Sequence, residues 1–168
     1  MNMVLFKGKQ VTLLGKQAKV GDQAEDFKVI NNKLEEVHLK DLKEKYLVIS
    51  VVPSLDTTVC DLQTRTVNEE LGKFKDVLVV TISNDLPFAQ ARWCGASGLT
   101  NVITLSDYNF HDFGMKFGVL IDELKLLARS VFVLDSKRKI IYAEYASETS
   151  QHLDYDQLLT FIKTLPEG

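Results

Sequence analysis

Short hydrophobic runs separated by turn residues open the chain. Val4–Phe6 and Val11–Leu14 lie on either side of a Gly-Lys turn. Phe27–Ile30 and Glu36–Leu39 lie in the same way on either side of residues 31–33. Two short apolar runs joined by a few turn-forming residues are typical of a β-hairpin. This part of the chain therefore predicts two hairpins.

A longer alternation of strand and helix begins at Leu47. Leu47–Val52 is a largely β-branched apolar run that stops at Pro53, as expected for a strand buried on both faces. From Thr58 to Phe74, apolar residues recur at helical spacing with charged residues between them, which predicts an amphipathic helix. The apolar residues of this helix are Val59, Leu62, Val67, Leu71 and Phe74.

The same alternation continues to the end of the chain. Val77–Ile82 is a second buried strand, Asp85–Cys94 a second helix and Val102–Leu105 a short strand. Ser130–Leu134 and Lys139–Tyr145 are joined by a short polar turn and predict a hairpin. A last helix carries its apolar residues on one face, namely Tyr155, Leu158, Leu159, Ile162 and Leu165.

The order of these elements predicts an α/β fold of the thioredoxin-like kind. Strands linked through helices form right-handed crossovers and therefore lie parallel in the centre of one sheet. The hairpin near the C-terminus adds antiparallel strands, so the central sheet is mixed and flanked by helices. The N-terminal β-hairpin is expected as an addition to this core. No linker or repeat interrupts the chain, so residues 1–168 are expected to form one domain.

Charge and cysteine content exclude several classes of protein. The chain has 168 residues, 45% of them hydrophobic, and 20 basic against 23 acidic residues give a net charge of −3. Nothing in this balance indicates a nucleic-acid surface. Cys60 and Cys94 are the two cysteines, too few for a disulfide scaffold and without the spacing of a zinc finger or a C-x-x-C motif.

The apolar segments are too short for export or membrane insertion. The run near the N-terminus extends from Met3 to Phe6, whereas the apolar core of a secretory signal takes about 7 to 15 residues. The longest run, Leu47 to Pro53, falls well short of the roughly 20 residues that span a bilayer. We expect a cytoplasmic protein with no membrane contact. There, a disulfide that forms is more often transient than structural.

Cys60 lies at the predicted start of an amphipathic helix. Unpaired N–H groups and the positive end of the helix dipole favour a thiolate, so the pKa of Cys60 should fall below its reference of about 8.5. Asp61 opposes that shift, so a cation from elsewhere in the chain is needed. Taken by itself, this placement leaves a small buried hydrophobic residue, the commonest role of a lone cysteine, as an equal alternative.

Two segments resemble the peroxiredoxins. Residues 53–60, Pro-Ser-Leu-Asp-Thr-Thr-Val-Cys, are similar to the signature P-x-x-x-T-x-x-C of that family. Residues 83–94, Ser-Asn-Asp-Leu-Pro-Phe-Ala-Gln-Ala-Arg-Trp-Cys, closely resemble the resolving-cysteine segment of its thiol peroxidase subfamily, an atypical two-cysteine group. The resemblance extends over essentially the whole chain. One departure is Glu25, where many peroxiredoxins have proline.

The resemblance implies an enzyme that reduces hydrogen peroxide and organic hydroperoxides. Cys60 would be the peroxidatic cysteine, which attacks the terminal peroxide oxygen and becomes a sulfenic acid. Thr57 would place its hydroxyl against the thiolate and the peroxide. Pro53 and Val59 would bind substrate, Val59 through its backbone N–H. Arg129, just before the strand at 130–134, matches the family's arginine, whose fork of donors can hold sulfur and departing oxygen together.

Cys94 would be the resolving cysteine and form an intramolecular disulfide with Cys60. A disulfide needs Cα atoms roughly 4.4 to 6.8 Å apart, and the two cysteines lie on different predicted helices. Gly95 and Gly98 follow Cys94, so we expect the end of the second helix to unwind when the disulfide forms. The family implies thioredoxin as reductant and a homodimer.

Other functions stay open at this point. A thioredoxin-fold oxidoreductase of protein thiols lacks support because no C-x-x-C is present. A peroxide sensor that passes its disulfide to a partner uses the same two sulfurs as an enzyme. His38, His111 and His152 have no metal-ligand spacing, and the glycines form no phosphate-binding loop, so neither cofactor nor metal is expected.

Apolar and basic residues near the two cysteines give weaker indications. Leu55, Phe88 and Trp93 slightly favour organic hydroperoxides, although core packing explains them equally well. Arg65 and Arg92 are expected at the surface.

Overall fold

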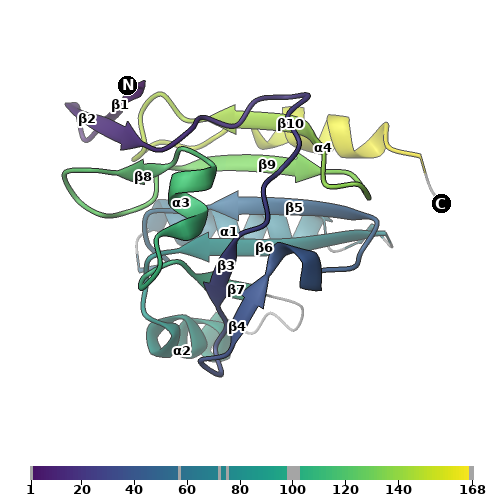
Figure 1. Ribbon diagram of the computed structural model, residues 1–168, viewed down its shortest axis with the longest axis horizontal. Helices are drawn as coiled ribbons and strands as arrows, with labels where there is room; N and C mark the ends of the chain where they lie inside the picture. Colours follow the sequence, from purple (N-terminus) through teal and green to yellow (C-terminus); the bar gives the residue numbers. More distant parts are fainter. Residues whose placement is uncertain (1, 57, 72, 75, 98–102, 167–168) are drawn as a thin grey trace.

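The computed structural model describes residues 2–56, 58–71, 73, 74, 76–97 and 103–166 (Figure 1). A seven-stranded mixed sheet forms its centre. Its strands, in spatial order, are β10 (Ile140–Tyr145), β9 (Ser130–Leu134), β5 (Tyr46–Val51), β6 (Val77–Ser83), β7 (Ile103–Ser106), β3 (Lys28–Ile30) and β4 (Glu36–His38). β5, β6 and β7 are parallel, whereas β9 and β3 run antiparallel to their neighbours.

The central strands are those with the strongest hydrophobic pattern. Every residue of β5 is buried, and so are the last five of β6. A strand with cover on both faces gains from apolar side chains at every position, which explains the unbroken runs. The predicted thioredoxin-like fold, with a parallel centre and an antiparallel hairpin at one edge, is confirmed.

The N-terminal hairpin belongs to a separate small sheet. β1 (Asn2–Phe6) pairs with β2 (Lys9–Leu14), and β2 pairs with β8 (Leu120–Ile121). The turn falls on Lys7 and Gly8, at φ values of 50° and 79°, one residue earlier than the predicted Gly-Lys turn. Positive φ at both central residues is the geometry that twists a two-residue turn in the same sense as its strands.

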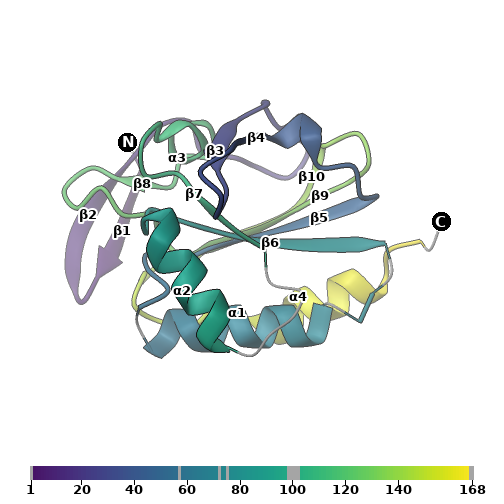
Figure 2. The same ribbon diagram turned by 90° about the horizontal axis from the view of Figure 1, so that it is seen from below.

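Helices cover both faces of the large sheet (Figure 2). α1 (Thr58–Leu71) and α4 (Tyr155–Lys163) lie side by side on one face, and α2 (Pro87–Ser97) packs against β7. The short α3 (Asp112–Lys116) lies across the opposite face with the N-terminal strands. A single 3-10 turn, Leu39–Asp41, follows β4.

Each face of the large sheet has its own cluster of packed side chains. Under α1 and α4, Val48 and Val131 pack with Leu71 and Leu158. Aromatic rings fill the opposite face, in a chain of contacts with centroids 4.6 to 5.7 Å apart. The rings are those of Phe27, Phe113, Phe117, Phe132 and Tyr145.

The helix boundaries differ from those that the pattern predicts. α1 ends at Leu71 rather than Phe74, because the chain turns there and the Phe74 N–H donates to the Leu71 carbonyl at 3.1 Å. Phe74 still packs on the core, so its apolar character is satisfied outside the helix. α2 begins at Pro87 instead of Asp85 and continues through Cys94 to Ser97.

A buried carboxylate, Asp107, fixes the segment between β7 and α3. Its two carboxylate oxygens accept from the N–H groups of Phe113, at 3.0 Å, and Gly114, at 2.8 Å. Burial raises the pKa of Asp107 to about 7 in spite of these two bonds. The folded protein therefore holds a proton that the unfolded chain releases near pH 4.

Stability should therefore depend on pH through Asp107. The stabilisation that protonated Asp107 gives to the folded protein is complete below about pH 4 and is lost as the pH rises through about 7. We expect the free energy of unfolding of the unaltered protein, minus that of Asp107→Asn, to fall by about 2 to 3 kcal/mol from pH 5 to 8. Urea unfolding measures this, with the exposed Asp122→Asn as control. A flat or rising difference contradicts the assignment.

Candidate active site

The loop after β5 leads into the helix that carries Cys60. Pro53 is buried two residues after the strand ends. α1 begins at Thr58, so Cys60 lies in its first turn, as the sequence predicts. The N–H groups and dipole of a helix start favour a negative sulfur at such a position. Thr57 lies outside the described residues, and so do the side chains of Val59 and Cys60.

Arg129 is buried and is held against α1. It directly precedes β9 and is 1% exposed, whereas composition alone would place it at a solvated strand edge. Its Nε donates to the carbonyl oxygen of Thr149 at 2.8 Å, and its Nη1 donates to the side-chain oxygen of Gln63. A buried guanidinium is costly unless its donors are used. Arg129 therefore brings a positive charge to the helix that carries Cys60 in its first turn.

Gln63 connects this arginine to the central sheet. It lies three residues after Cys60 on α1 and is fully buried. Its Nε2 donates to Ser50 Oγ of β5 at 2.7 Å, while its Oε1 accepts from Arg129. Because residues three apart share a helix face, Gln63 and Cys60 belong to the same side of α1. The guanidinium is thus tied to the face of α1 that includes position 60.

The N-terminal hairpin supports the carbonyl that holds Arg129. The Leu5 N–H donates to the Ser147 carbonyl at 2.8 Å, and the Thr149 N–H donates to the Leu5 carbonyl at 2.7 Å. Glu148 accepts from the N–H groups of Ser150, at 2.9 Å, and Gly8, at 2.8 Å. Such bonds lower the pKa of Glu148 to about 2, and the bond from the Ser150 N–H has the largest effect. The hairpin therefore anchors the segment that positions Arg129.

Asp85 ties the loop before Cys60 to the segment that leads into α2. Its Oδ1 accepts from Ser54 Oγ at 2.7 Å, and its Oδ2 accepts from the Leu55 N–H at 2.8 Å and from Ser83 Oγ at 2.7 Å. Its own carbonyl accepts from Ser106 Oγ at 2.5 Å. One carboxylate thus joins the β5 loop and β6 immediately ahead of the helix that carries Cys94.

Trp93 and Cys94 are neighbours on α2, but they face different parts of the molecule. Trp93 packs on Val52 and Leu55, in the loop that precedes α1. The Arg65 guanidinium lies 5.8 Å from the centre of its ring, a cation–π contact. Arg65 is therefore half-buried at this contact and not simply a surface residue, as the sequence suggested. The indole marks the side of α2 that faces the Cys60 loop.

The Cys94 sulfur points to the sheet edge instead. It is half-buried, lies 3.4 Å from Thr104 Oγ1 of β7 and accepts from Asn32 Nδ2 at 3.9 Å. Asn32 belongs to the turn between β3 and β4. Successive residues on a helix are about 100° apart, so Cys94 and Trp93 occupy different sides of α2.

Comparison with known sequences identifies the family. The Redoxin family model matches residues 19–159. The thiol peroxidase of Bacillus subtilis (strain 168) is 58% identical over 165 residues, which cover 98% of this chain and 99% of the relative. The chain belongs to the thiol peroxidase family. The thiol peroxidase of Listeria innocua is 51% identical over 163 residues, 97% of this chain and 99% of the relative.

Solved structures agree with this family and with the fold. A peroxiredoxin-like protein from Aquifex aeolicus superposes with a TM-score of 0.89 at 37% identity, covering 97% of this chain and 96% of the other. A thiol peroxidase from Chromobacterium violaceum has a TM-score of 0.87 at 20% identity, covering 96% and 95%, which is a likeness of fold. The expected family, the thioredoxin-like fold and the class of enzyme, a peroxiredoxin, are confirmed.

Several residues of this region escape a reading of the sequence. Gln63 and Thr64 are polar residues on the buried side of α1, and a polar residue among apolar helix positions is the signal that marks Gln63. Asp85 stands in the segment that resembles the family, with no local pattern to show what it binds. Asn32 and Thr104 belong to a turn and a short strand whose sequences carry no sign of a contact with Cys94.

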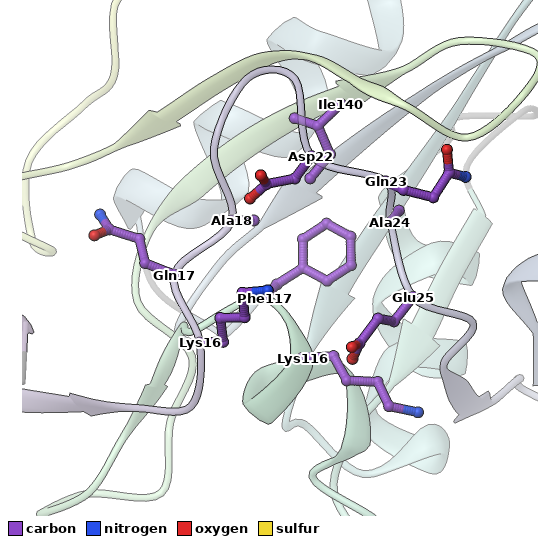
Figure 3. Close-up of a pocket in the computed structure, with 10 residues that line it drawn as sticks. All are labelled: Lys16, Gln17, Ala18, Asp22, Gln23, Ala24, Glu25, Lys116, Phe117 and Ile140. Carbon is purple, nitrogen blue, oxygen red and sulfur yellow. The ribbon is translucent and has the colours of Figure 1, made fainter.

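A small cavity lies elsewhere, under the segment that joins β2 to β3 (Figure 3). It measures about 50 Å³ and is lined by residues 16–18 and 22–25 together with Lys116, Phe117 and Ile140. This is space for a few water molecules. None of its lining residues belongs to the loops around Cys60 and Cys94.

No helix in the described ranges is long and apolar enough to cross a membrane. Within the same part of the chain, no group of three or more His, Cys, Asp or Glu side chains could hold a metal ion. His38 bonds to Glu36 at 2.6 Å and to Asp26 at 3.4 Å, and the bond to Glu36 is the main cause that raises its pKa.

Proposed function

We propose that the protein reduces hydroperoxides through a sulfenic acid on Cys60 and an intramolecular disulfide with Cys94. The observation that carries this proposal is the buried Arg129, which is bonded through Gln63 to the helix that carries Cys60 in its first turn. A thiolate at a helix start gains charge stabilisation from such a cation. The membership of the thiol peroxidase family supports the same chemistry.

The peroxide step makes a sulfur–oxygen bond and breaks an oxygen–oxygen bond. The Cys60 thiolate attacks the terminal oxygen, and the departing oxygen takes a proton to leave as water or an alcohol. Lowering a thiol pKa also weakens the nucleophile, with a Brønsted slope of about 0.4 to 0.5, so thiolate formation alone does not make a fast reaction. The Arg129 fork, the Thr57 hydroxyl and the Val59 N–H, beside Pro53, would stabilise charge on the departing oxygen.

The resolving step makes the disulfide. The Cys94 sulfur attacks the Cys60 sulfur, the sulfur–oxygen bond breaks, and the sulfenic oxygen leaves as water. A dithiol reductant of the thioredoxin type then exchanges with the disulfide and restores both thiols. The resemblance to peroxiredoxins also supports a homodimer, and light scattering tests this oligomeric state. A cytoplasmic location stays a prediction.

A coupled assay tests the proposed function. Thioredoxin, thioredoxin reductase and NADPH are mixed with the protein and an excess of hydroperoxide, and NADPH oxidation is followed. We expect many turnovers per chain. Oxidation that stops after one equivalent would indicate a sensor that relays its disulfide, and no oxidation above the reductase blank would contradict peroxidase activity with this reductant.

Replacement of Arg129 by lysine should slow the peroxide step. Lysine keeps the charge but cannot donate to Thr149 and Gln63 in the same fork. We expect the single-turnover rate constant with peroxide to fall by about 10²-fold or more, the scale of losing one donor to a developing oxyanion. Stopped-flow fluorescence of Trp93 measures it. The exposed Arg92→Lys is the matched control, and an unchanged rate in Arg129→Lys would remove Arg129 from the mechanism.

Formation of the disulfide should unwind the end of α2. The Cys94 sulfur faces Thr104, whereas the Cys60 loop lies on the Trp93 side of the helix. Amide exchange, compared between reduced and oxidised protein, should show lost protection around Cys94. Protection should persist near Gln90, whose Nε2 donates to Ser83 Oγ and to the Leu105 carbonyl, both at 3.0 Å. Equal protection around Cys94 in both states would contradict the unwinding.

A further inference from the structure

Asn32, Thr104 and Cys94 form a ring of hydrogen bonds at the edge of the sheet. We propose that Asn32 and Thr104 are positioning residues that hold the Cys94 sulfur at the sheet edge, turned away from Cys60, until the resolving step begins. The inference rests on the proposed function, because it takes Cys94 as the resolving cysteine. The ring itself rests on three contacts among described residues.

The donors and acceptors of the ring can be assigned one after another. Thr104 Oγ1 donates to Asn32 Oδ1 at 3.0 Å. A hydroxyl has one proton, so the 3.4 Å contact between Thr104 Oγ1 and the Cys94 sulfur needs its proton from the thiol. Asn32 Nδ2 faces the same sulfur at 3.9 Å and donates to it. These contacts join the three side chains to one another.

The ring keeps the Cys94 sulfur at the edge of the sheet. Before the sulfur can approach Cys60, it has to leave both Thr104 and Asn32. The ring therefore opposes the movement that the resolving step needs.

Both partners are held in place by their own surroundings. Thr104 is 3% exposed and lies in β7, paired with β6. The turn that carries Asn32 is fixed by Asn31, whose Oδ1 accepts from the N–H groups of Lys33 at 2.9 Å and Glu35 at 3.0 Å. Side chains that are preorganised in this way lose little freedom when they bond to the sulfur. Release of Cys94 is then a distinct step that breaks the ring.

Alkylation of Cys94 tests the ring without any reference to peroxide. In a Cys60→Ser background, iodoacetamide reports how often the Cys94 sulfur is released from the ring and can react. We expect Thr104→Val to raise the alkylation rate about two- to tenfold, the range set by the loss of one hydrogen bond. Asn32→Ala, at an exposed turn position, should act in the same direction without disturbing the core.

The chain offers two matched controls. Thr104→Ser keeps the hydroxyl and should restore the original rate. Thr81 is the cross-strand partner of Thr104, is 1% exposed, and within the described part of the chain its hydroxyl has no hydrogen-bond partner. Thr81→Val should therefore leave alkylation unchanged. An unchanged rate in both Thr104→Val and Asn32→Ala, or an equal rise in Thr81→Val, would overturn the proposal.

A second readout separates the ring from the proposed function. With Cys60 restored, Thr104→Val should complete about two- to tenfold more turnovers before Cys60 is over-oxidised, because a released Cys94 competes better with a second peroxide. Faster alkylation together with unchanged over-oxidation would support the ring and contradict the resolving role of Cys94. Unchanged alkylation in an active peroxidase would contradict the ring and leave the proposed function intact.

Discussion

Cys60→Ser is expected to stop peroxide consumption. Serine has nearly the same shape, but its hydroxyl does not ionise at neutral pH, so the first turn of α1 would carry no nucleophile. We expect the rate of loss of hydrogen peroxide and of an organic hydroperoxide to fall by more than about 10³-fold, the scale on which loss of a nucleophile acts. The measurement follows each peroxide directly, in the presence of a thiol reductant.

The interpretation of this result needs a folded variant. Serine at position 60 should leave the thermal unfolding temperature close to that of the unaltered protein, because it keeps the residue's size at a helix start. The matched control is Cys94→Ser, which also removes one sulfur but keeps Cys60. Peroxide consumption that persists in Cys60→Ser would place the reactive sulfur elsewhere and contradict the mechanism.

Cys94→Ser should separate the peroxide step from the resolving step. We expect this variant to consume about one equivalent of peroxide and then to stall as a sulfenic acid, which a second peroxide oxidises to the sulfinic acid. The steady-state rate of NADPH oxidation with thioredoxin should fall at least about tenfold, because no disulfide forms for the reductant to exchange with. Mass spectrometry of the stalled protein identifies the oxygen on Cys60.

The rate of the first turnover is the internal control for Cys94→Ser. Its rate constant should match that of the unaltered protein, since Arg129 and the Cys60 loop are untouched. Full steady-state activity in this variant would remove Cys94 from the cycle. A slow first turnover would instead show that Cys94 contributes to the peroxide step itself.

The main elements of the fold could be predicted because local hydrophobic patterns in the sequence determine them. The apolar runs at 47–52 and 77–82 correspond to β5 and β6, which are buried on both faces. Boundaries were less accurate because tertiary packing decides them. Phe74 continues the helical pattern of α1 but packs on the core from a turn beyond the helix.

In the candidate site, too, the sequence predicts the residues marked by a motif but not the contacts that the fold creates. Cys60 and Cys94 stand out by motif, and Arg129 by its match to the family. The contacts around them join distant parts of the chain, with 66 positions between Arg129 and Gln63 and 72 between Thr104 and Asn32. No local pattern reports such pairs. These pairs depend on the fold, which brings the residue before β9 to α1 and the β3–β4 turn to β7.

The burial of Arg129 shows the difference in physical terms. A charged residue just before a strand is usually solvated, and apart from the match to the family the sequence gives no other indication for Arg129. The fold places Thr149 and Gln63 where their oxygens can accept from the guanidinium. These hydrogen bonds offset the cost of removing the charge from water. That partnership depends on the N-terminal hairpin, whose Leu5 holds the segment containing Thr149.

Disulfide mapping after a single equivalent of peroxide tests the central claim most directly. Reduced protein is treated with hydrogen peroxide, remaining thiols are alkylated, and the unreduced digest is analysed by mass spectrometry. We predict that both thiols disappear together and that the peptides containing Cys60 and Cys94 are joined within one chain. Two thiols that remain alkylatable, or a bond between Cys60 residues of two chains, would contradict the proposed cycle.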